Sequence, residues 1–366
     1  MKAMWIVIFF ALPIVGVTYV LWHIWHLLPF ANSWRWVATG VGAVLFLTMF
    51  AGFSGIIEKL PLDIATATYE VGNSFIFILL YLVMIFLALD LGRVAHIVPK
   101  AWLISNGYTA TAILALMLAV FGYGNIHYYH KTRQQLQLTT AKPIAFNGGE
   151  AKIVLLSDLH LGYHNRREEF KKWVDTINAE RPDLILIAGD IIDISVRPLL
   201  EERVAEEFHR LKAPVYATLG NHEYYSGSEK ARKFYHDAGI TLLRDSVVSV
   251  GGIAIIGRDD RTNVHRKPLV KLMSGVPKGE FSILLDHQPY HLEEAEHCGV
   301  DFQFSGHTHY GQVWPASWIT RAMYEKAYGY TQKGHTHYYV SSGMGIWGGK
   351  FRIGTQSEYV VLTIKR

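Results

Sequence analysis

Five short polar blocks between residues 157 and 309 carry side chains that ligate metal ions. In chain order they are Ser157-Asp158-Leu159-His160, Gly189-Asp190-Ile191-Ile192-Asp193, Gly220-Asn221-His222-Glu223, Asp286-His287 and Gly306-His307-Thr308-His309. Each block follows a run of aliphatic or β-branched residues, which predicts that it emerges where a strand ends and a loop begins. Carboxylate and amide oxygens mixed with imidazoles suit a pair of divalent transition-metal ions, and such a pair is suited to phosphoryl chemistry.

The first two blocks offer ligands for one ion and a bridge to a second. Asp158 and His160 are two residues apart, and alternate side chains of an extended segment share a face, so both can reach the same ion. Gly189 lets the backbone turn tightly before Asp190, and we expect this carboxylate to lie between the two ions. Asp193 is expected to hold the loop or a neighbouring imidazole instead.

The third block combines a metal ligand with a proton donor. Asn221 offers a neutral carbonyl oxygen to the second ion, whereas His222, next in the chain, points elsewhere and can protonate a leaving oxygen. Glu223 either orients His222 or is a solvated loop residue.

The remaining expected ligands are histidines. His287 and His307 would complete the second ion, and His309 would complete the first. Gly-His-Thr-His occurs twice, and only the copy at residues 306–309 follows an apolar strand as the other blocks do. The second copy is interpreted as a turn before a strand, so His335 and His337 are excluded from the ligand set.

The ordered motifs D-x-H, G-D-x-x-D, G-N-H-[DE], H and G-H-x-H resemble those of the calcineurin-like metallophosphoesterase family, over about residues 131 to 366. The resemblance implies a four-layer α/β/β/α sandwich and a binuclear centre of manganese, iron or zinc, with manganese favoured. It implies that the first metal takes Asp158, His160, Asp190 and His309, and the second Asp190, Asn221, His287 and His307. His222 matches the family's catalytic histidine. The expected reaction is in-line attack on phosphorus by a metal-activated water.

Three places outside the motifs are candidates for substrate contact. Arg258 and Arg261, which follow a strand, could pair with a second phosphate, or they form an ion-pair loop. Tyr163 and Arg166 follow the first metal block, where the alternative is solvation of a helix start. Residues 310–330 mix aromatic and basic side chains, which suits contact with a bilayer surface or an acyl chain; ordinary packing of a long loop is the alternative.

The first third of the chain is strongly apolar. Four stretches are close to the roughly 20 residues that cross a bilayer, and they are interpreted as transmembrane helices at about Met4–Leu28, Val37–Ile57, Asn73–Leu91 and Tyr108–Tyr123. A cleaved signal peptide is the alternative for the first stretch, but its apolar run is too long and lacks a small-residue cleavage site. Tryptophans near the proposed span ends fit interfacial positions.

These patterns predict a transmembrane region over residues 1–125, a linker and domain entry over 126–150, and a metallophosphoesterase domain over 151–366. Aliphatic runs predict strands at Ile153–Ser157, Leu184–Ala188, Val215–Leu219, Ile253–Gly257, Ser282–Leu285, Phe302–Phe304, Tyr338–Ser341 and Tyr359–Ile364. Helices are predicted at Arg167–Ala179, Leu199–Leu211, Glu229–Ala238 and His291–Glu296. Two packed sheets with helices outside are expected.

Charge and cysteine content narrow the class of protein. The formal net charge of +4 is small for 366 residues, and no Lys/Arg-rich run with interleaved aromatics occurs, so nucleic-acid binding is not expected. The single cysteine, Cys298, precludes an intrachain disulfide. We expect a multi-pass protein of the bacterial inner membrane, with its catalytic domain on the cytoplasmic side.

A hydrolase held by membrane spans is expected to act on a phosphate or pyrophosphate ester in the bilayer. The arrangement resembles bacterial membrane-associated phosphoesterases related to UDP-2,3-diacylglucosamine pyrophosphatases, which cut a pyrophosphate in lipid A synthesis. The alternatives are a broad-specificity phosphodiesterase or phosphatase, and a membrane transporter or sensor that its metallodomain regulates.

Overall fold

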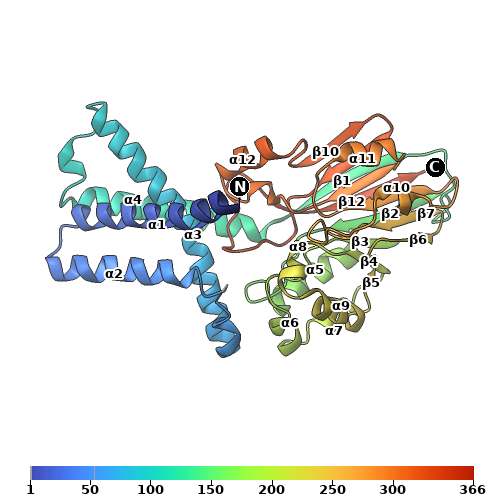
Figure 1. The fold of residues 1–366 in the computed structure, drawn as a ribbon, viewed down its shortest axis with the longest axis horizontal. Helices are drawn as coiled ribbons and strands as arrows, with labels where there is room; N and C mark the ends of the chain where they lie inside the picture. The colour runs from blue at the N-terminus through green and yellow to red at the C-terminus, as the bar shows by residue number, and fades with distance from the viewer. Residues whose placement is uncertain (1, 53) are drawn as a thin grey trace. The chain divides into compact units, whose positions relative to one another are not determined.

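The computed structural model describes residues 2–52 and 54–366, and it describes the exposure of side chains from residue 11 onward (Figure 1). The chain forms two compact units. One comprises residues 1–126 and 348–351, and the other comprises residues 127–347 and 352–366.

The first unit is helical. Its main helices are α1 (Lys2–Leu27), α2 (Asn32–Thr48), α3 (Leu62–Val94) and α4 (Gly107–Tyr129), with the short turns η1 (Ile57–Lys59) and η2 (Lys100–Trp102) between them. Each of the four expected apolar stretches therefore overlaps a helix. Buried apolar side chains from α1, α2 and α3, among them Val20, Phe46 and Phe86, pack against one another.

Only part of the expected membrane region is long and apolar enough to cross a membrane, among the residues that the structure describes. In the described part of the chain, α3 and α4 are long and apolar enough to cross a membrane. The 17-residue α2 is shorter than the roughly 20 residues that a crossing takes. For α1, which has 26 residues, side chains are described only from residue 11 onward, so only its apolar stretch 11–27 is assessed. Four spans are therefore not confirmed.

The second unit is built on two six-stranded sheets. The first has the order β1 (Lys131–Thr139), β12 (Ser357–Lys365), β2 (Glu150–Leu156), β3 (Leu184–Ala188), β4 (Val215–Thr218) and β5 (Thr241–Leu242). Strands β2 to β5 are parallel, and β12 is antiparallel to β2. The carboxyl ends of β2, β3 and β4 therefore meet at one edge.

The second sheet has the order β10 (Gly329–Lys333), β11 (Thr336–Val340), β9 (Phe302–Ser305), β8 (Phe281–Leu285), β7 (Ile253–Gly257) and β6 (Ser246–Val250). Its central strands β11, β9, β8 and β7 are parallel, and antiparallel hairpins form both edges. The carboxyl ends of β8 and β9 therefore also share an edge.

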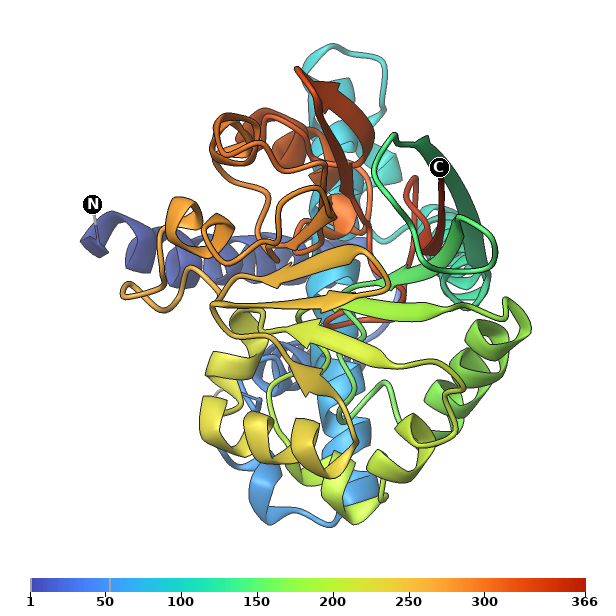
Figure 2. The same ribbon diagram turned by 90° about the vertical axis from the view of Figure 1, so that its right-hand side faces the viewer.

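The ribbon in Figure 2 shows the strands and the helices around them, and three buried side-chain clusters hold these layers together. Side chains of α5 (Arg167–Ala179), α6 (Arg197–Glu201), α7 (Ala205–Phe208) and α9 (Ser228–Asp237) cover one face of the first sheet. The two sheets share a core that includes Leu186, Ile255 and Ile283. Side chains of α10 (Leu269–Met273) and α11 (Leu292–His297) cover the outer face of the second sheet. The expectation of two packed sheets with helices outside is confirmed.

The stretch 126–150, expected to be a linker and domain entry, contains the first strand of the first sheet. Within it, β1 pairs in parallel with β12 along its full length and so belongs to the first sheet. The hydrophobic pattern that predicts a strand is weak here, because β1 is an edge strand with the sequence KTRQQLQLT, of which Leu138 alone is buried. The expected helix Leu199–Leu211 is instead two short helices, α6 and α7.

Leu186→Ala should lower the free energy of unfolding by about 2–5 kcal/mol, because Leu186 is fully buried between the two sheets and the smaller side chain leaves a cavity. Leu200→Ala, on α6, is the matched control; this side chain is 59% exposed and its loss should cost about 0.5 kcal/mol or less. Thermal or denaturant unfolding of the purified full chain measures both. Equal losses would contradict the assignment of the shared core.

Candidate metal centre

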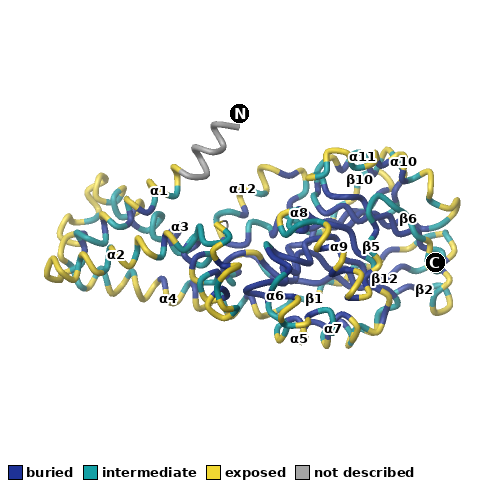
Figure 3. Tube along the Cα trace, turned by 60° about the horizontal axis from the view of Figure 1, so that its bottom comes forward, coloured by how far each residue is buried: buried dark blue, intermediate teal, exposed yellow. Residues whose placement is uncertain are grey.

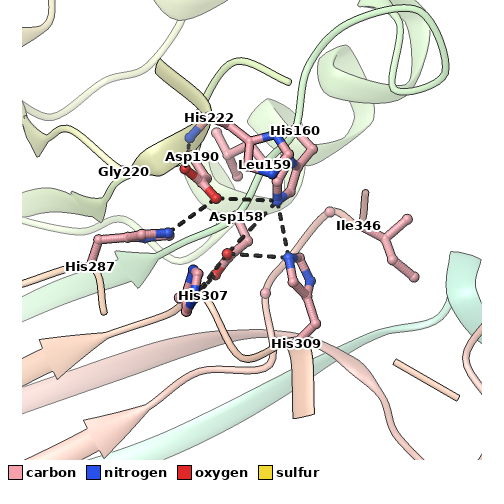
Figure 4. A network of polar contacts seen from close by, with 12 residues as sticks. Asp158, Leu159, His160, Asp190, Gly220, His222, His287, His307, His309 and Ile346 are labelled. Carbon is pink, nitrogen blue, oxygen red and sulfur yellow. Dashed lines mark hydrogen bonds and ion pairs between the residues drawn. The ribbon is translucent and has the colours of Figure 1, made fainter. Parts of the chain in front are cut away.

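The five polar blocks begin where five strands end. The first three follow β2, β3 and β4 of the first sheet, and the last two follow β8 and β9 of the second. Because the sheets pack face to face, their ligand blocks converge on one site (Figure 4). The convergence joins residues far apart in the chain, such as His160 and His309, which are 149 positions apart.

One group of potential ligands comprises Asp158, His160 and His309, all of them buried. The Nε2 atoms of His160 and His309 lie 3.0 Å apart, and His309 Nε2 lies 3.3 Å from Asp158 Oδ1. Their donor atoms fall within 4.8 Å of one another, close enough for one ion to contact all three.

A second group comprises Asp190, His287 and His307. His287 Nε2 lies 3.0 Å from Asp190 Oδ2. The carbonyl oxygen of Asn221 lies 3.2 Å from His287 Nε2 and 2.8 Å from His307 Nδ1, so it faces the same point.

Asp190 lies between the two groups. Its Oδ2 atom is 3.0 Å from His287 Nε2 in the second group and 3.6 Å from His160 Nε2 in the first. This is the position that a bridging carboxylate needs. The other oxygen, Oδ1, accepts a hydrogen bond from the backbone N–H of His222 at 2.9 Å, which orients the carboxylate.

The ligand backbone is held in an unusual conformation. Five potential ligands have φ between 45° and 70°, in the left-handed region: Asp158, His160, Asp190, His307 and His309. Non-glycine residues rarely adopt it, and such strain persists only where the surroundings enforce it. Part of the enforcement comes from Glu223, whose carboxylate accepts backbone N–H groups of Asp190, Ile192 and Gly220.

The carboxylate that faces His222 is that of Asp193 and not that of Glu223. Glu223 is fully buried and bonds the loop backbone, whereas His222 Nδ1 lies 3.1 Å from Asp193 Oδ1. Asp193 also lies 3.3 Å from His160 Nδ1 and 3.6 Å from His164 Nδ1. One buried carboxylate therefore positions three imidazoles, which extends the expectation that Asp193 holds a neighbouring imidazole.

The charges of the site suit cation binding. Burial acts to raise the pKa of Asp158, but His309 and His160 outweigh it and lower that pKa. The pKa of Asp190 is also lowered, because His287 and His222 outweigh burial. Both carboxylates are therefore ionised near neutral pH.

The imidazoles complete this donor set. Burial, reinforced by the charge of His287, lowers the pKa of His307 to about 4, so that imidazole is neutral and offers a lone pair. Ionised carboxylates, an amide oxygen and imidazoles converging at these distances fit two divalent transition-metal ions.

Arg352 is a functional neighbour that the sequence did not indicate. Its side chain is fully buried and donates hydrogen bonds to the carbonyl oxygens of His309 at 2.8 Å and Ser342 at 2.5 Å. It therefore fixes the loop that carries His309. Arg352 lies in no recognisable sequence motif, so its burial could not be predicted from the sequence.

Three of the four expected substrate-binding residues do not offer a free polar group to a substrate. Tyr163 is fully buried. Arg166 pairs with Glu202, and Arg258 lies 3.2 Å from Asp286 Oδ2 and 2.7 Å from Glu294 Oε2. These guanidinium groups are taken by protein carboxylates. Arg258 instead holds Asp286, the residue before the potential ligand His287.

Arg261, the fourth, is placed differently. Its guanidinium lies 4.4 Å over the Tyr290 ring, and its Nη1 atom is buried with no hydrogen-bond partner among the described residues. Tyr290 Oη lies 3.1 Å from Tyr324 Oη, and the Tyr324 ring is 6.3 Å from that of His307. A chain of aromatic rings thus joins Arg261 to the second ligand group.

The second Gly-His-Thr-His copy lies in the hairpin of β10 and β11. His337 is on β11, where its Nδ1 atom lies 2.8 Å from Tyr330 Oη. Neither His335 nor His337 belongs to a ligand group found among the described residues. The turn comprises Gly334 and His335, and the strand begins at Thr336, two residues earlier than expected.

Comparisons with known proteins identify the family. A family model described as calcineurin-like phosphoesterase matches residues 151–311, which contain all five ligand blocks. The metallophosphoesterase YkuE of Bacillus subtilis is 31% identical over 265 residues, covering 67% of this chain and 90% of that protein. The chain belongs to the calcineurin-like phosphoesterase family. Family membership implies dependence on a pair of divalent metal ions, for which the two ligand groups are the candidates.

Other relatives match over less of their own length. A metallophosphoesterase of Helicobacter pylori is 32% identical over 225 residues, covering 59% of this chain and 60% of its own length. A transmembrane protein with metallophosphoesterase domain from Danio rerio is 30% identical over 287 residues, covering 72% of this chain and 64% of its own. The chain thus spans under two thirds of these relatives.

Gly220→Ala should weaken metal binding at least tenfold, because a Cβ at Gly220 would overlap the Asp190 carboxylate and displace the bridging ligand. Gly122→Ala is the matched control, since a Cβ there would meet no atom within 4 Å. Metal content after dialysis, or calorimetric titration with Mn²⁺, measures the effect. If Gly220→Ala retained two ions per chain at wild-type affinity, the bridging position of Asp190 would be wrong.

Proposed function

We propose that this calcineurin-like phosphoesterase hydrolyses a phosphodiester or pyrophosphate bond with the help of two divalent metal ions. The observation that carries the proposal is the pair of ligand groups that share Asp190, with His222 at their edge. The proposed ligands are Asp158, His160, Asp190, Asn221, His287, His307 and His309, and manganese is the favoured metal.

The two ions, when bound, would polarise the phosphoryl oxygens and supply a nucleophilic hydroxide near neutral pH. The protein's own side chains orient the general acid and protonate the leaving oxygen. Asp193 faces Nδ1 of His222 and so orients its ring, which is 15% exposed at the site. His222 can then donate a proton from Nε2 to the departing oxygen.

A lipid-linked substrate is the second part of the proposal. The helices α3 and α4 are long and apolar enough to cross a membrane, and the Danio rerio relative is by name a transmembrane protein. A membrane-anchored hydrolase reaches esters in its own bilayer without a soluble carrier. UDP-2,3-diacylglucosamine is the candidate by resemblance, with the protein in the bacterial inner membrane and its catalytic unit on the cytoplasmic side.

Arg261 is the proposed contact for a second phosphate. Its buried Nη1 has no hydrogen-bond partner among the described residues, while Arg258 is paired with carboxylates. A guanidinium is well suited to bind a phosphate through two parallel hydrogen bonds. A pyrophosphate therefore fits this site better than a simple diester does. A broad-specificity phosphodiesterase is the alternative, and it would not depend on Arg261.

Asp190→Asn and His222→Ala should each reduce hydrolysis of bis(p-nitrophenyl) phosphate at least a hundredfold while the protein stays folded. Asp190→Asn removes the bridging carboxylate of the metal pair, and His222→Ala removes the general acid. His222→Ala should retain its metal content, because His222 is assigned to neither ion. His335→Ala, in the second Gly-His-Thr-His copy, is the matched histidine control and should leave turnover unchanged. Near-normal hydrolysis by either variant would contradict the role assigned to that residue.

Arg261→Ala should lower kcat/KM for a pyrophosphate diester roughly 10- to 100-fold, as expected for losing a charged hydrogen bond, and leave that for bis(p-nitrophenyl) phosphate within about twofold. Arg232→Ala, on the exposed helix α9, is the control. Steady-state kinetics on both substrates provide the comparison. Equal losses on the two substrates would contradict a role in binding a second phosphate.

The substrate class is tested by presenting UDP-linked lipids, phospholipids and simple diesters to the full chain purified with its native metals. Release of UMP from a UDP-lipid would support a lipid-linked pyrophosphate. Turnover of diesters together with inertness towards every lipid would favour the broad-specificity phosphodiesterase.

A further inference from the structure

Helix α12 (Ala316–Met323) exposes its large apolar side chains. Trp318, Ile319 and Met323 are 62%, 61% and 57% exposed, whereas the polar Ser317 is buried. Ile319 and Met323 are four residues apart and so share a face of the helix, next to Trp318. The preceding Trp314 is 40% exposed, and its ring meets that of Trp318 edge to face at 5.3 Å. In Figure 3 the trace along α12 includes exposed stretches. We call Trp314, Trp318, Ile319 and Met323 the apolar face of α12.

This face is tied closely to the metal centre. The turn η3 (His309–Gly311) leads from the potential ligand His309 towards α12, and Gly311, with φ of 71°, packs so tightly on the backbone of Ser317 that a Cβ would not fit. The Arg321 guanidinium lies 5.2 Å over the Tyr310 ring. The helix is therefore held against the loop that carries His309.

The other end of α12 is tied to the second ligand group. Tyr324 directly follows the helix, and its ring lies 6.3 Å from that of His307 and 4.8 Å from that of Tyr290. Tyr324 is buried, whereas its neighbour Met323 is exposed. The apolar face thus begins one residue away from a side chain that lines the metal centre.

A bilayer surface is the partner that this face fits. Paired tryptophans with aliphatic neighbours suit the membrane–water interface, and the exposed Arg321 supplies a cation for anionic headgroups. The α4 helix is long and apolar enough to cross a bilayer, and only His130 separates its end from the start of β1. A membrane-spanning α4 would therefore hold the second unit at the bilayer surface. Exposed apolar patches of this kind mark contact sites in soluble domains.

We propose that the apolar face of α12 inserts into the interface of an anionic phospholipid bilayer and so presents a membrane-held phosphate ester to the metal centre. The presentation of substrate rests on the proposed function. The insertion itself does not.

Fluorescence quenching tests the insertion. The full chain carrying Cys298→Ser and Met323→Cys is labelled with the environment-sensitive dye NBD and reconstituted in vesicles of phosphatidylethanolamine and phosphatidylglycerol. Leu200→Cys in the same background is the control, since Leu200 is an exposed apolar residue on another helix of the same unit. Doxyl-labelled lipid should quench the dye at position 323 several-fold more than the dye at position 200. Equal quenching would overturn the proposal, as would a blue-shifted but unquenched dye at 323, which indicates cover by a second copy.

A charge substitution links insertion to substrate. Trp318→Glu with Ile319→Glu should abolish the quenching at 323 and lower hydrolysis of a vesicle-held phosphate ester at least tenfold, with turnover of soluble bis(p-nitrophenyl) phosphate retained. Val270→Glu, at an exposed apolar position on α10, is the matched control. Undiminished hydrolysis of the vesicle-held ester by the double variant would overturn the presentation of substrate. If the wild type hydrolysed neither ester, the proposed function would fail, while quenching would still decide the insertion.

Discussion

Two hydrogen bonds between the packed sheets hold the metal centre together. His287, at the end of a strand in the second sheet, donates from Nδ1 to the carbonyl oxygen of Ala188 in the first sheet at 2.7 Å. The backbone N–H of His307 donates to the Asp158 carboxylate at 3.0 Å. Both bonds require the face-to-face packing of the sheets. Without that packing, the ligands of either ion would lie on separate surfaces.

A high density of buried charge is the consequence of this convergence. Asp158, Asp190 and Asp193 are buried together, and a buried carboxylate is costly unless it is paired and hydrogen-bonded. The surrounding imidazoles and backbone N–H groups offset that cost. The same arrangement leaves lone pairs aimed at two points, which is the chemical basis for a pair of divalent cations. Stability and metal binding therefore depend on the same contacts.

Three arginines stabilise the site from outside. Arg258 and Arg266 bind the carboxylate of Asp286, the residue before His287, and Arg352 binds the backbone of His309. Arg261 differs because an aromatic ring supports its guanidinium and no described carboxylate binds it. The rings of Tyr290 and Tyr324 lie between this guanidinium and His307, and the guanidinium is the proposed contact for a second phosphate.

The sequence by itself determined the ligand blocks, their order and the two-sheet class, because Asp, Asn and His motifs directly after aliphatic runs are local patterns. It also distinguished the two Gly-His-Thr-His copies, since only one follows a buried strand. Tertiary structure alone decided which carboxylate orients His222, the burial of Arg352 and the pairing of Arg258, because each depends on a partner distant in the chain. The edge strand β1 and the outward apolar face of α12 also became visible only there, since their patterns are defined by what the neighbouring elements cover.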